Sequence, residues 1–135
     1  ISDPGFLLVR EAIKKEIQIT CLPGPTALIP ALVLSGLSSD AFIFEGFLPR
    51  KKGRKSKLYE ISQNTKTSIL YESPFRIIKT LSDMKQTIGS DRKIAIVREI
   101  SKIYEEVFRG TIEEAILEYN ERTIKGEFVI CIDKA

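Results

Sequence analysis

The sequence predicts an α/β protein whose helices cover sheets, and two observations lead to this prediction. Strand-like and helix-like segments alternate along all 135 residues, which is the pattern of a sheet packed against helices. Hydrophobic residues make up 43% and charged residues 29% of the chain, a composition typical of folded globular proteins. We therefore expect six strands and five helices.

The first helix is expected at residues 3–15, "DPGFLLVREAIKK". Asp3 suits the N-cap and Pro4 the first helical position, where its missing N–H costs nothing. A short strand, "QITCL", is expected at residues 18–22, and the turn residues "PGP" end it.

The second helix is expected at residues 26–36, with Thr26 as its N-cap and Gly36 just past its end. Pro30 falls in or just after the first turn, where a proline is least costly. The polar stretch "LSSDA" at residues 37–41 is turn-like, and we expect it to link two lobes.

The remaining elements are expected in the order strand, helix, strand, helix, strand, strand, helix, strand. Their predicted ranges are 42–47, 54–63, 67–71, 73–89, 93–99, 104–110, 111–121 and 126–133. The helix at 73–89 has the clearest pattern, with Ser73 as N-cap, Pro74 at the first position and Gly89 as terminator. Its apolar stripe consists of Ile77, Ile78, Leu81, Met84 and Ile88.

Several classes of function lack support in the sequence. The chain has no histidine, and its two cysteines, Cys21 and Cys131, lie singly in apolar runs, so neither a zinc site nor a disulfide framework is indicated. Residues 27–34, the longest apolar stretch, are too few to cross a bilayer. Neither a dinucleotide-binding glycine fingerprint nor a P-loop is present. We expect a cytoplasmic setting and no metal.

Six basic side chains stand within "PRKKGRKSK", residues 49–57. They are Arg50, Lys51, Lys52, Arg54, Lys55 and Lys57. Guanidinium groups form forked hydrogen bonds to phosphates, and several neutralised phosphates give strong, salt-dependent binding. Charge alone leaves two interpretations open, a solvated loop and a nucleic-acid contact.

Three short motifs stand directly before predicted helices: "SDPG" at 2–5, "PGPT" at 23–26 and "YESP" at 71–74. Backbone N–H groups at a helix start favour an anionic or polar ligand group. The simpler alternative is that the side chains in these motifs only cap helices. Four glutamates, Glu45, Glu72, Glu99 and Glu127, lie in or beside strands; each is a candidate general base or the partner of an arginine or lysine.

Five stretches, taken together, help to decide between these alternatives: "ISDPGFLLVREA", "LPGPTALIPALVLSGL", "FEGFLP", "LYESPFRI" and "GEFV". In this order and spacing they resemble the tetrapyrrole methylase superfamily and, within it, the ribosomal RNA small subunit methyltransferase I family. The resemblance implies transfer of a methyl group from S-adenosylmethionine to the ribose 2′-oxygen of a cytidine in the decoding region of 16S rRNA. It also implies that the complete protein is a homodimer that acts on the small ribosomal subunit.

The same resemblance assigns the parts of the chain. Residues 1–36 are expected to be the C-terminal portion of the N-terminal lobe, 37–41 the linker, and 42–135 the complete C-terminal lobe of a two-lobed methylase fold. The chain is therefore expected to be an N-terminally truncated fragment that is inactive alone.

Site residues carry over position by position. The implied S-adenosylmethionine-binding residues are Ser2, Asp3, Pro4, Pro23, Gly24, Pro25, Thr26, Tyr71, Glu72 and Ser73. The implied RNA-binding residues are the six basic side chains named above and Arg76. Glu45 and Glu72 are the candidate catalytic bases, while Phe75 stands where the family usually has histidine, which argues against a catalytic imidazole there.

Two alternatives remain. A small-molecule methylase for precorrin- or uroporphyrin-type tetrapyrroles has the same expected fold, although a mobile polybasic segment suits an extended polyanion better. A non-catalytic RNA-binding module is the other, and binding of S-adenosylmethionine distinguishes it from an enzyme.

Overall fold

The computed structural model describes residues 5–135 and has the alternating order of helices and strands that the sequence predicts. The elements are α1 (Phe6–Lys14), α2 (Leu28–Ser35), β1 (Phe42–Phe47), α3 (Arg54–Ser62), β2 (Thr67–Glu72), α4 (Ile77–Thr87), β3 (Lys93–Arg98), β4 (Glu106–Thr111), α5 (Ile112–Asn120) and β5 (Phe128–Ile132). The predicted α/β class is confirmed. All five expected helices form within the described residues, as do five of the six expected strands.

The five strands make one mixed sheet in the order β1-β2-β5-β3-β4. β1 pairs with β2 in parallel, whereas β5 is antiparallel to both of its neighbours, β2 and β3. The last strand in the chain therefore occupies the centre of the sheet, and every one of its residues is buried.

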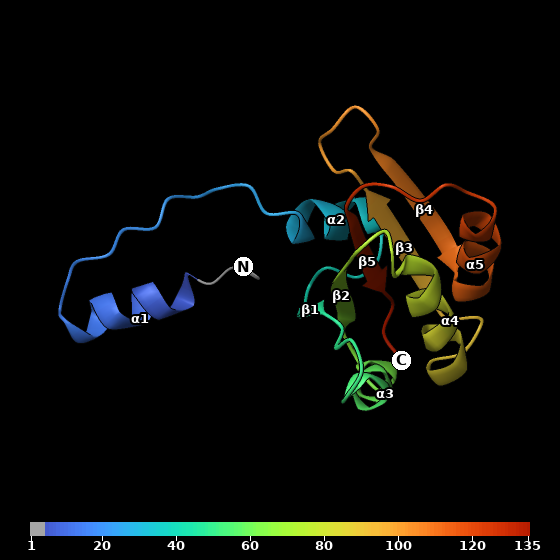
Figure 1. Cartoon of the computed structure of the whole chain (residues 1–135), viewed down its shortest axis with the longest axis horizontal. Helices are drawn as coiled ribbons and strands as arrows, with labels where there is room; N and C mark the ends of the chain where they lie inside the picture. The colour runs from blue at the N-terminus through green and yellow to red at the C-terminus, as the bar shows by residue number, and fades with distance from the viewer. Residues whose placement is uncertain (1–4) are drawn as a thin grey trace.

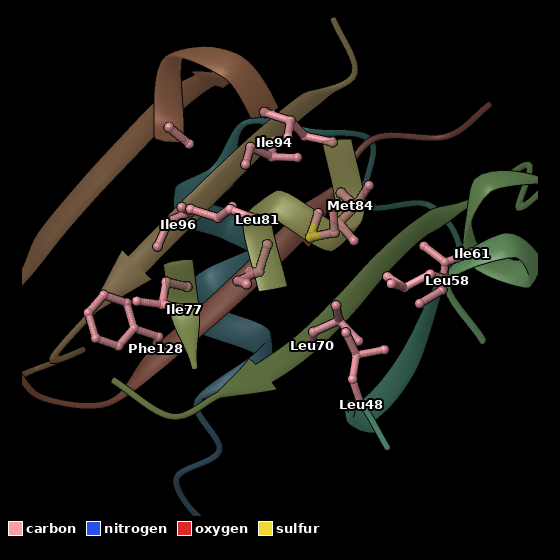
Figure 2. Close-up of a cluster of buried hydrophobic side chains, with 14 of the residues drawn as sticks. Leu48, Leu58, Ile61, Leu70, Ile77, Leu81, Met84, Ile94, Ile96 and Phe128 are labelled. Atoms are coloured by element: carbon pink, nitrogen blue, oxygen red, sulfur yellow. The ribbon is translucent and has the colours of Figure 1, made fainter. Parts of the chain in front are cut away.

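Each central strand sends alternate side chains to opposite faces of the sheet. On one face, Ile130 and Ile132 of β5 join a cluster with side chains from α3, α4 and α5. Figure 2 shows members of this cluster, among them Leu70, Leu81 and Ile96, pointing toward one another between strands and helix. Because both faces are covered, these strands are nearly continuous apolar runs rather than alternating ones.

The second face of the sheet is covered by α2. Leu28, Ala31 and Leu32 are buried there against Val129 and Cys131 of β5 and neighbouring side chains. Gly36 ends this helix with φ +71°, in agreement with its predicted role as terminator. The expected lobe boundary at 37–41 stays a prediction, although α2, assigned to the preceding lobe, packs on this sheet.

The strand expected at residues 18–22 is wrong. This stretch has no regular secondary structure and is exposed, because no strand lies beside it to pair with its backbone groups. It belongs to the extended segment that joins α1 to α2, and Figure 1 shows α1 lying apart from the sheet at the end of this segment. No residue of α1 is buried.

Two predicted helix starts are also wrong. α2 begins at Leu28 with Ala27 in the N-cap position, so Thr26 does not cap it. α4 begins at Ile77, three residues after the predicted first position Pro74, because Ser73 starts a turn in which its carbonyl accepts a hydrogen bond from the Arg76 backbone N–H. The predicted caps Asp3 and Pro4 lie outside the described residues.

The clearest cap in the described part of the chain is at α5. The Thr111 hydroxyl accepts from the Glu114 backbone N–H at 3.2 Å, and the Glu114 carboxylate accepts from the Thr111 N–H at 2.7 Å. This reciprocal pair is a capping box, and its T-x-x-E signature is visible in the sequence. Between residues 5 and 135, no helix is both long and apolar enough to cross a membrane.

The two cysteines should differ sharply in reactivity. Cys21 is exposed on the extended segment, whereas Cys131 is fully buried in β5, and burial raises the pKa of its thiol to about 12. Because the thiolate is the reactive form, we expect Ellman's reagent to modify Cys21 alone in the folded chain and both thiols in denaturant. Cys21→Ser should abolish labelling of the folded chain; labelling of Cys131 at the rate of Cys21 would contradict the sheet described here.

Candidate functional site

A cavity of about 330 Å³ opens at the carboxyl end of β2, where the "YES" motif lies. Tyr71, Glu72 and Ser73 line it together with Phe47 from the end of β1. The start of β5, which pairs with the end of β2, and the loop before it supply four more lining residues: Gly126, Glu127, Phe128 and Val129. Ala27 and Pro74 complete a largely apolar and aromatic wall with few polar groups, which is the usual composition of a small-molecule site.

A second cavity of about 250 Å³ shares Ala27, Glu127 and Val129 with the first. Pro25 and Thr26 of the "PGPT" motif line it. We call these two adjoining cavities the central cleft. Two of the three predicted motifs, "PGPT" and "YESP", therefore border one cleft, although they are distant in the sequence.

Not every predicted cofactor residue reaches the central cleft. Pro23 and Gly24 line neither of its two cavities. Ser2, Asp3 and Pro4 lie outside the described residues. The loop after β3 does contribute to it, through Ile100 and Ser101, which the sequence had not singled out.

Glu72 is almost fully buried, and its carboxylate already has several partners. One oxygen accepts a hydrogen bond from the Ser73 backbone N–H at 2.7 Å and forms an ion pair with Arg76 at 2.7 Å. The other accepts from the Thr80 hydroxyl at 2.6 Å. With both oxygens occupied, this carboxylate fixes the turn that follows β2.

The Thr80 hydroxyl also accepts a hydrogen bond from Arg54, at 2.8 Å, and so joins Glu72 to the basic run. The Arg54 guanidinium is buried and forms a further ion pair with Asp83 at 2.7 Å. Burial of Asp83 favours its protonated form, but hydrogen bonds from Arg54 and Lys79 outweigh this effect and hold the pKa of Asp83 below its usual value. We call Arg54, Glu72, Thr80 and Asp83 the buried polar network.

Glu45, the other predicted base, lies away from the central cleft. The register of β1 shifts between Phe44 and Gly46, and Gly46 has φ +66°, so Glu45 occupies an irregularity of the strand. Its carboxylate contacts Lys57 at 2.6 Å and accepts a hydrogen bond from Asn64 at 3.2 Å. In this structure Glu45 anchors α3 to β1.

The six cations of the basic run thus divide into two groups. Arg54 and Lys57 point inward to carboxylates, whereas the other four, Arg50, Lys51, Lys52 and Lys55, are exposed. Three of these four, with Lys79 of α4, line a groove of about 300 Å³ between α3 and α4. We call the four exposed cations the basic edge.

Sequence reasoning missed the role of Thr80 and Asp83. A signal was present, because Thr80 falls on the same helical face as Ile77, Leu81 and Met84, and a polar residue on an apolar stripe needs a buried partner. Within residues 5–135, no group of three or more acidic or thiol side chains is arranged as a metal site.

Comparison with known proteins gives matches to a family model, to related proteins and to solved structures. The family model for tetrapyrrole (corrin/porphyrin) methylases matches residues 1–116. The chain is 44% identical over 133 residues to the ribosomal RNA small subunit methyltransferase I of Synechocystis sp., covering 98% of this chain and 48% of that protein. It is 47% identical over 134 residues to the protein of the same name from Halalkalibacterium halodurans, covering 98% of this chain and 46% of that protein.

Among solved structures, uroporphyrin-III C-methyltransferase from Thermus thermophilus, complexed with S-adenosyl homocysteine, superposes with a TM-score of 0.62 at 16% identity. The match covers 97% of this chain and 60% of that structure, and it establishes a shared fold. The chain spans about half the length of the relatives it matches.

Replacing Arg54 should cost far more stability than replacing its neighbour. Arg54→Ala removes the donor that Asp83 and the Thr80 hydroxyl share and leaves their inward-facing oxygens without this partner, so we expect the free energy of unfolding to fall by about 1–3 kcal/mol. Lys55→Ala removes an exposed cation and should change it by less than about 0.5 kcal/mol. Urea unfolding of the three proteins tests this, and equal losses in both variants would exclude the buried polar network as a stabilising element.

The lowered pKa of Asp83 predicts a specific acid sensitivity. Its ionised form stabilises the fold above the usual value of 3.8, and this contribution disappears as the pH falls through the lower pKa of the folded state. Asp83→Asn should therefore lower stability at pH 7 and reduce the further loss between pH 7 and acidic pH. Urea midpoints across this range provide the measurement, with exposed Asp91→Asn as the control that follows the unmodified chain; parallel curves for all three proteins would refute the assignment.

Proposed function

Because the chain belongs to the tetrapyrrole methylase family, we propose that the whole protein transfers a methyl group from S-adenosylmethionine to the ribose 2′-oxygen of a cytidine in 16S rRNA. The names of the relatives, small subunit methyltransferases at 44% and 47% identity, support an rRNA substrate. The observation that carries the proposal is the position of Arg50, a member of the basic edge. It lines both the groove between α3 and α4 and a further cavity that shares Phe47 and Ser73 with the central cleft.

The central cleft fits S-adenosylmethionine in its chemistry. Phe47 and Tyr71 offer aromatic surface to an adenine, while Thr26 and Ser73 supply hydroxyl groups beside it. We also propose contacts from the other residues predicted on this cleft, namely Ser2, Asp3, Pro4, Pro23, Gly24, Pro25 and Glu72. When bound, the sulfonium supplies an activated methyl group, and the residues of the cleft orient the reactants and exclude water.

The two candidate bases differ in their position relative to the central cleft and in the partners of their carboxylates. Glu72 lines the central cleft, but its oxygens already accept hydrogen bonds from Ser73 and Thr80 and pair with Arg76. We therefore propose that Glu72 acts by positioning Ser73 and Arg76. Glu45 is paired with Lys57 and lines none of the cavities described above, so we propose an anchoring role for it.

RNA contact is proposed for the basic edge and for Arg76. Four exposed cations on one edge match the regular negative charge of an RNA backbone. Arg54 and Lys57 serve this contact indirectly, because their inward ion pairs fix the start of α3 and leave the neighbouring cations pointing outward. We further propose a cytoplasmic location and a homodimer for the whole protein; exposed apolar side chains on α1, such as Leu8 and Ile13, suit a protein contact.

Two alternative functions remain to be separated from this one. A tetrapyrrole methylase has the same fold, and the Thermus thermophilus structure is an example. A non-catalytic RNA-binding module needs no methyl donor. The basic edge favours RNA over a tetrapyrrole, because a compact acid needs a few placed cations rather than an extended row.

The complete protein should methylate RNA and should need the basic edge to do so. We would supply radiolabelled S-adenosylmethionine with small ribosomal subunits that lack the modification, and a tetrapyrrole acid in parallel. Label should enter ribose. Changing Arg50, Lys51, Lys52 and Lys55 to alanine should reduce the rate at subsaturating subunit concentration at least about tenfold and make its logarithmic salt dependence shallower by about 3.

A matched control removes four exposed cations from other places on the chain: Lys66, Lys93, Lys125 and Lys134. This variant should keep the rate of the unmodified protein. Label in the tetrapyrrole would favour a tetrapyrrole substrate. Equal losses of rate in both variants would contradict the proposed RNA contact of the basic edge. Binding of RNA without any methyl transfer would indicate the non-catalytic module.

A further inference from the structure

An open cavity of about 790 Å³ lies beside the central cleft and shares Phe47 and Ser73 with it. Phe75, Arg76 and Arg50 also line this cavity. Its volume is within the range of roughly 300–1,000 Å³ that small-molecule sites occupy. We call it the Phe75 pocket.

Phe75 is the most distinctive residue of this pocket, because 94% of its surface is exposed. It stands in the turn between β2 and α4, where its backbone N–H donates to the Ser73 hydroxyl at 3.3 Å. The turn therefore holds the backbone of Phe75 while its ring packs against almost nothing in the chain. Such a ring offers its face to a flat partner.

The other side of the pocket is aromatic and cationic. Phe47 is half-exposed, with its ring centroid 5.8 Å from that of Tyr71. The Arg76 guanidinium lies 5.9 Å from the Phe47 ring centroid and is held by its ion pair with Glu72. Arg50 continues the positive charge from here into the groove of the basic edge.

This combination matches a nucleotide. Single-stranded nucleic acids bind where aromatic side chains stack on bases beside cations that contact phosphates. A compact tetrapyrrole acid satisfies the rings and Arg76, but it leaves the extended charge beyond Arg50 unexplained. The observations therefore favour one base of an RNA strand whose backbone continues along the basic edge.

We infer that the Phe75 pocket receives one unstacked base of the RNA substrate, which stacks on the Phe75 ring beside the central cleft. The inference rests on the RNA substrate proposed above and adds a positioning site to it. Holding a base here fixes the register of the strand and orders its ribose next to the methyl donor. An enzyme that modifies a ribose gains rate from such positioning.

The test measures initial rates of methyl transfer by the complete protein to small ribosomal subunits lacking the modification. Phe75→Ala should lower kcat/KM for the subunits about 5- to 150-fold, the effect of losing one stacked base. The KM for S-adenosylmethionine, the melting temperature and the logarithmic salt dependence should not change, since the exposed ring contributes neither charge nor packing.

Conservative variants separate stacking from simple apolar contact. Phe75→Tyr and Phe75→His keep a ring and should retain the activity within a few-fold, whereas Phe75→Leu should behave like Phe75→Ala. Tyr104→Ala is the matched control, because it removes an aromatic side chain that is 71% exposed on the loop after β3. Its kinetics should equal those of the unmodified protein.

Each contrary outcome is distinguishable. If the unmodified protein methylates subunits and Phe75→Ala does so equally well, the inference fails while the proposed function stands. Full activity of Phe75→Leu rejects base stacking. If the unmodified protein does not methylate subunits, the proposed function and the inference are both contradicted. Methylation of a tetrapyrrole acid that depends on Phe75 would instead assign the pocket to that ligand.

Discussion

The guanidinium of Arg54 is the point on which the candidate site depends. Apolar packing holds helices on a sheet without a strict direction, whereas Arg54 makes directed, charge-assisted bonds to Thr80 and Asp83 of α4. Through the Thr80 hydroxyl it also reaches Glu72 at the end of β2. The start of α3, one face of α4 and the turn that carries Ser73 are thereby fixed relative to one another.

This arrangement gives one short segment two separate tasks. Arg54 and Lys57 form ion pairs with carboxylates inside the fold, so the helix that carries them is anchored at its first turn. Their neighbours are left exposed, Lys55 on this helix and Arg50, Lys51 and Lys52 in the loop directly before it. An electrostatic surface built on an anchored helix start keeps its charges in register, which a free polybasic loop does not.

Elements whose signal is local were predictable from the sequence. The strand at residues 42–47 was predicted with the bounds that β1 has, and the apolar stripe of α4 correctly identified its buried face. The starts of α2 and α4 were misjudged because Thr26 and Ser73 have cap chemistry, yet neither caps its helix: α2 begins two residues after Thr26, and the Ser73 carbonyl accepts from the Arg76 N–H in a turn that precedes α4. "QITCL" has strand composition, yet a strand also needs a neighbour with which to pair.

The site was predictable in part for the same reason. The order and spacing of the motifs predicted that "PGPT" and "YESP" form one site, and residues of both line the central cleft. It did not distinguish Arg54 from Lys55, because burial of one and exposure of the other depend on Asp83, which is far away in the sequence. Thr80 and Asp83 acquire their roles only when α4 packs beside α3.

The central position of β5 has a consequence for the order in which the fold is completed. β1 and β2 form one half of the sheet and β3 and β4 the other, and only residues 128–132 join them. During synthesis both halves emerge from the ribosome before that strand does, each with an unpaired edge facing the gap. Closure of the sheet must therefore wait for the latest of its five strands, and until then these open edges invite pairing with other chains.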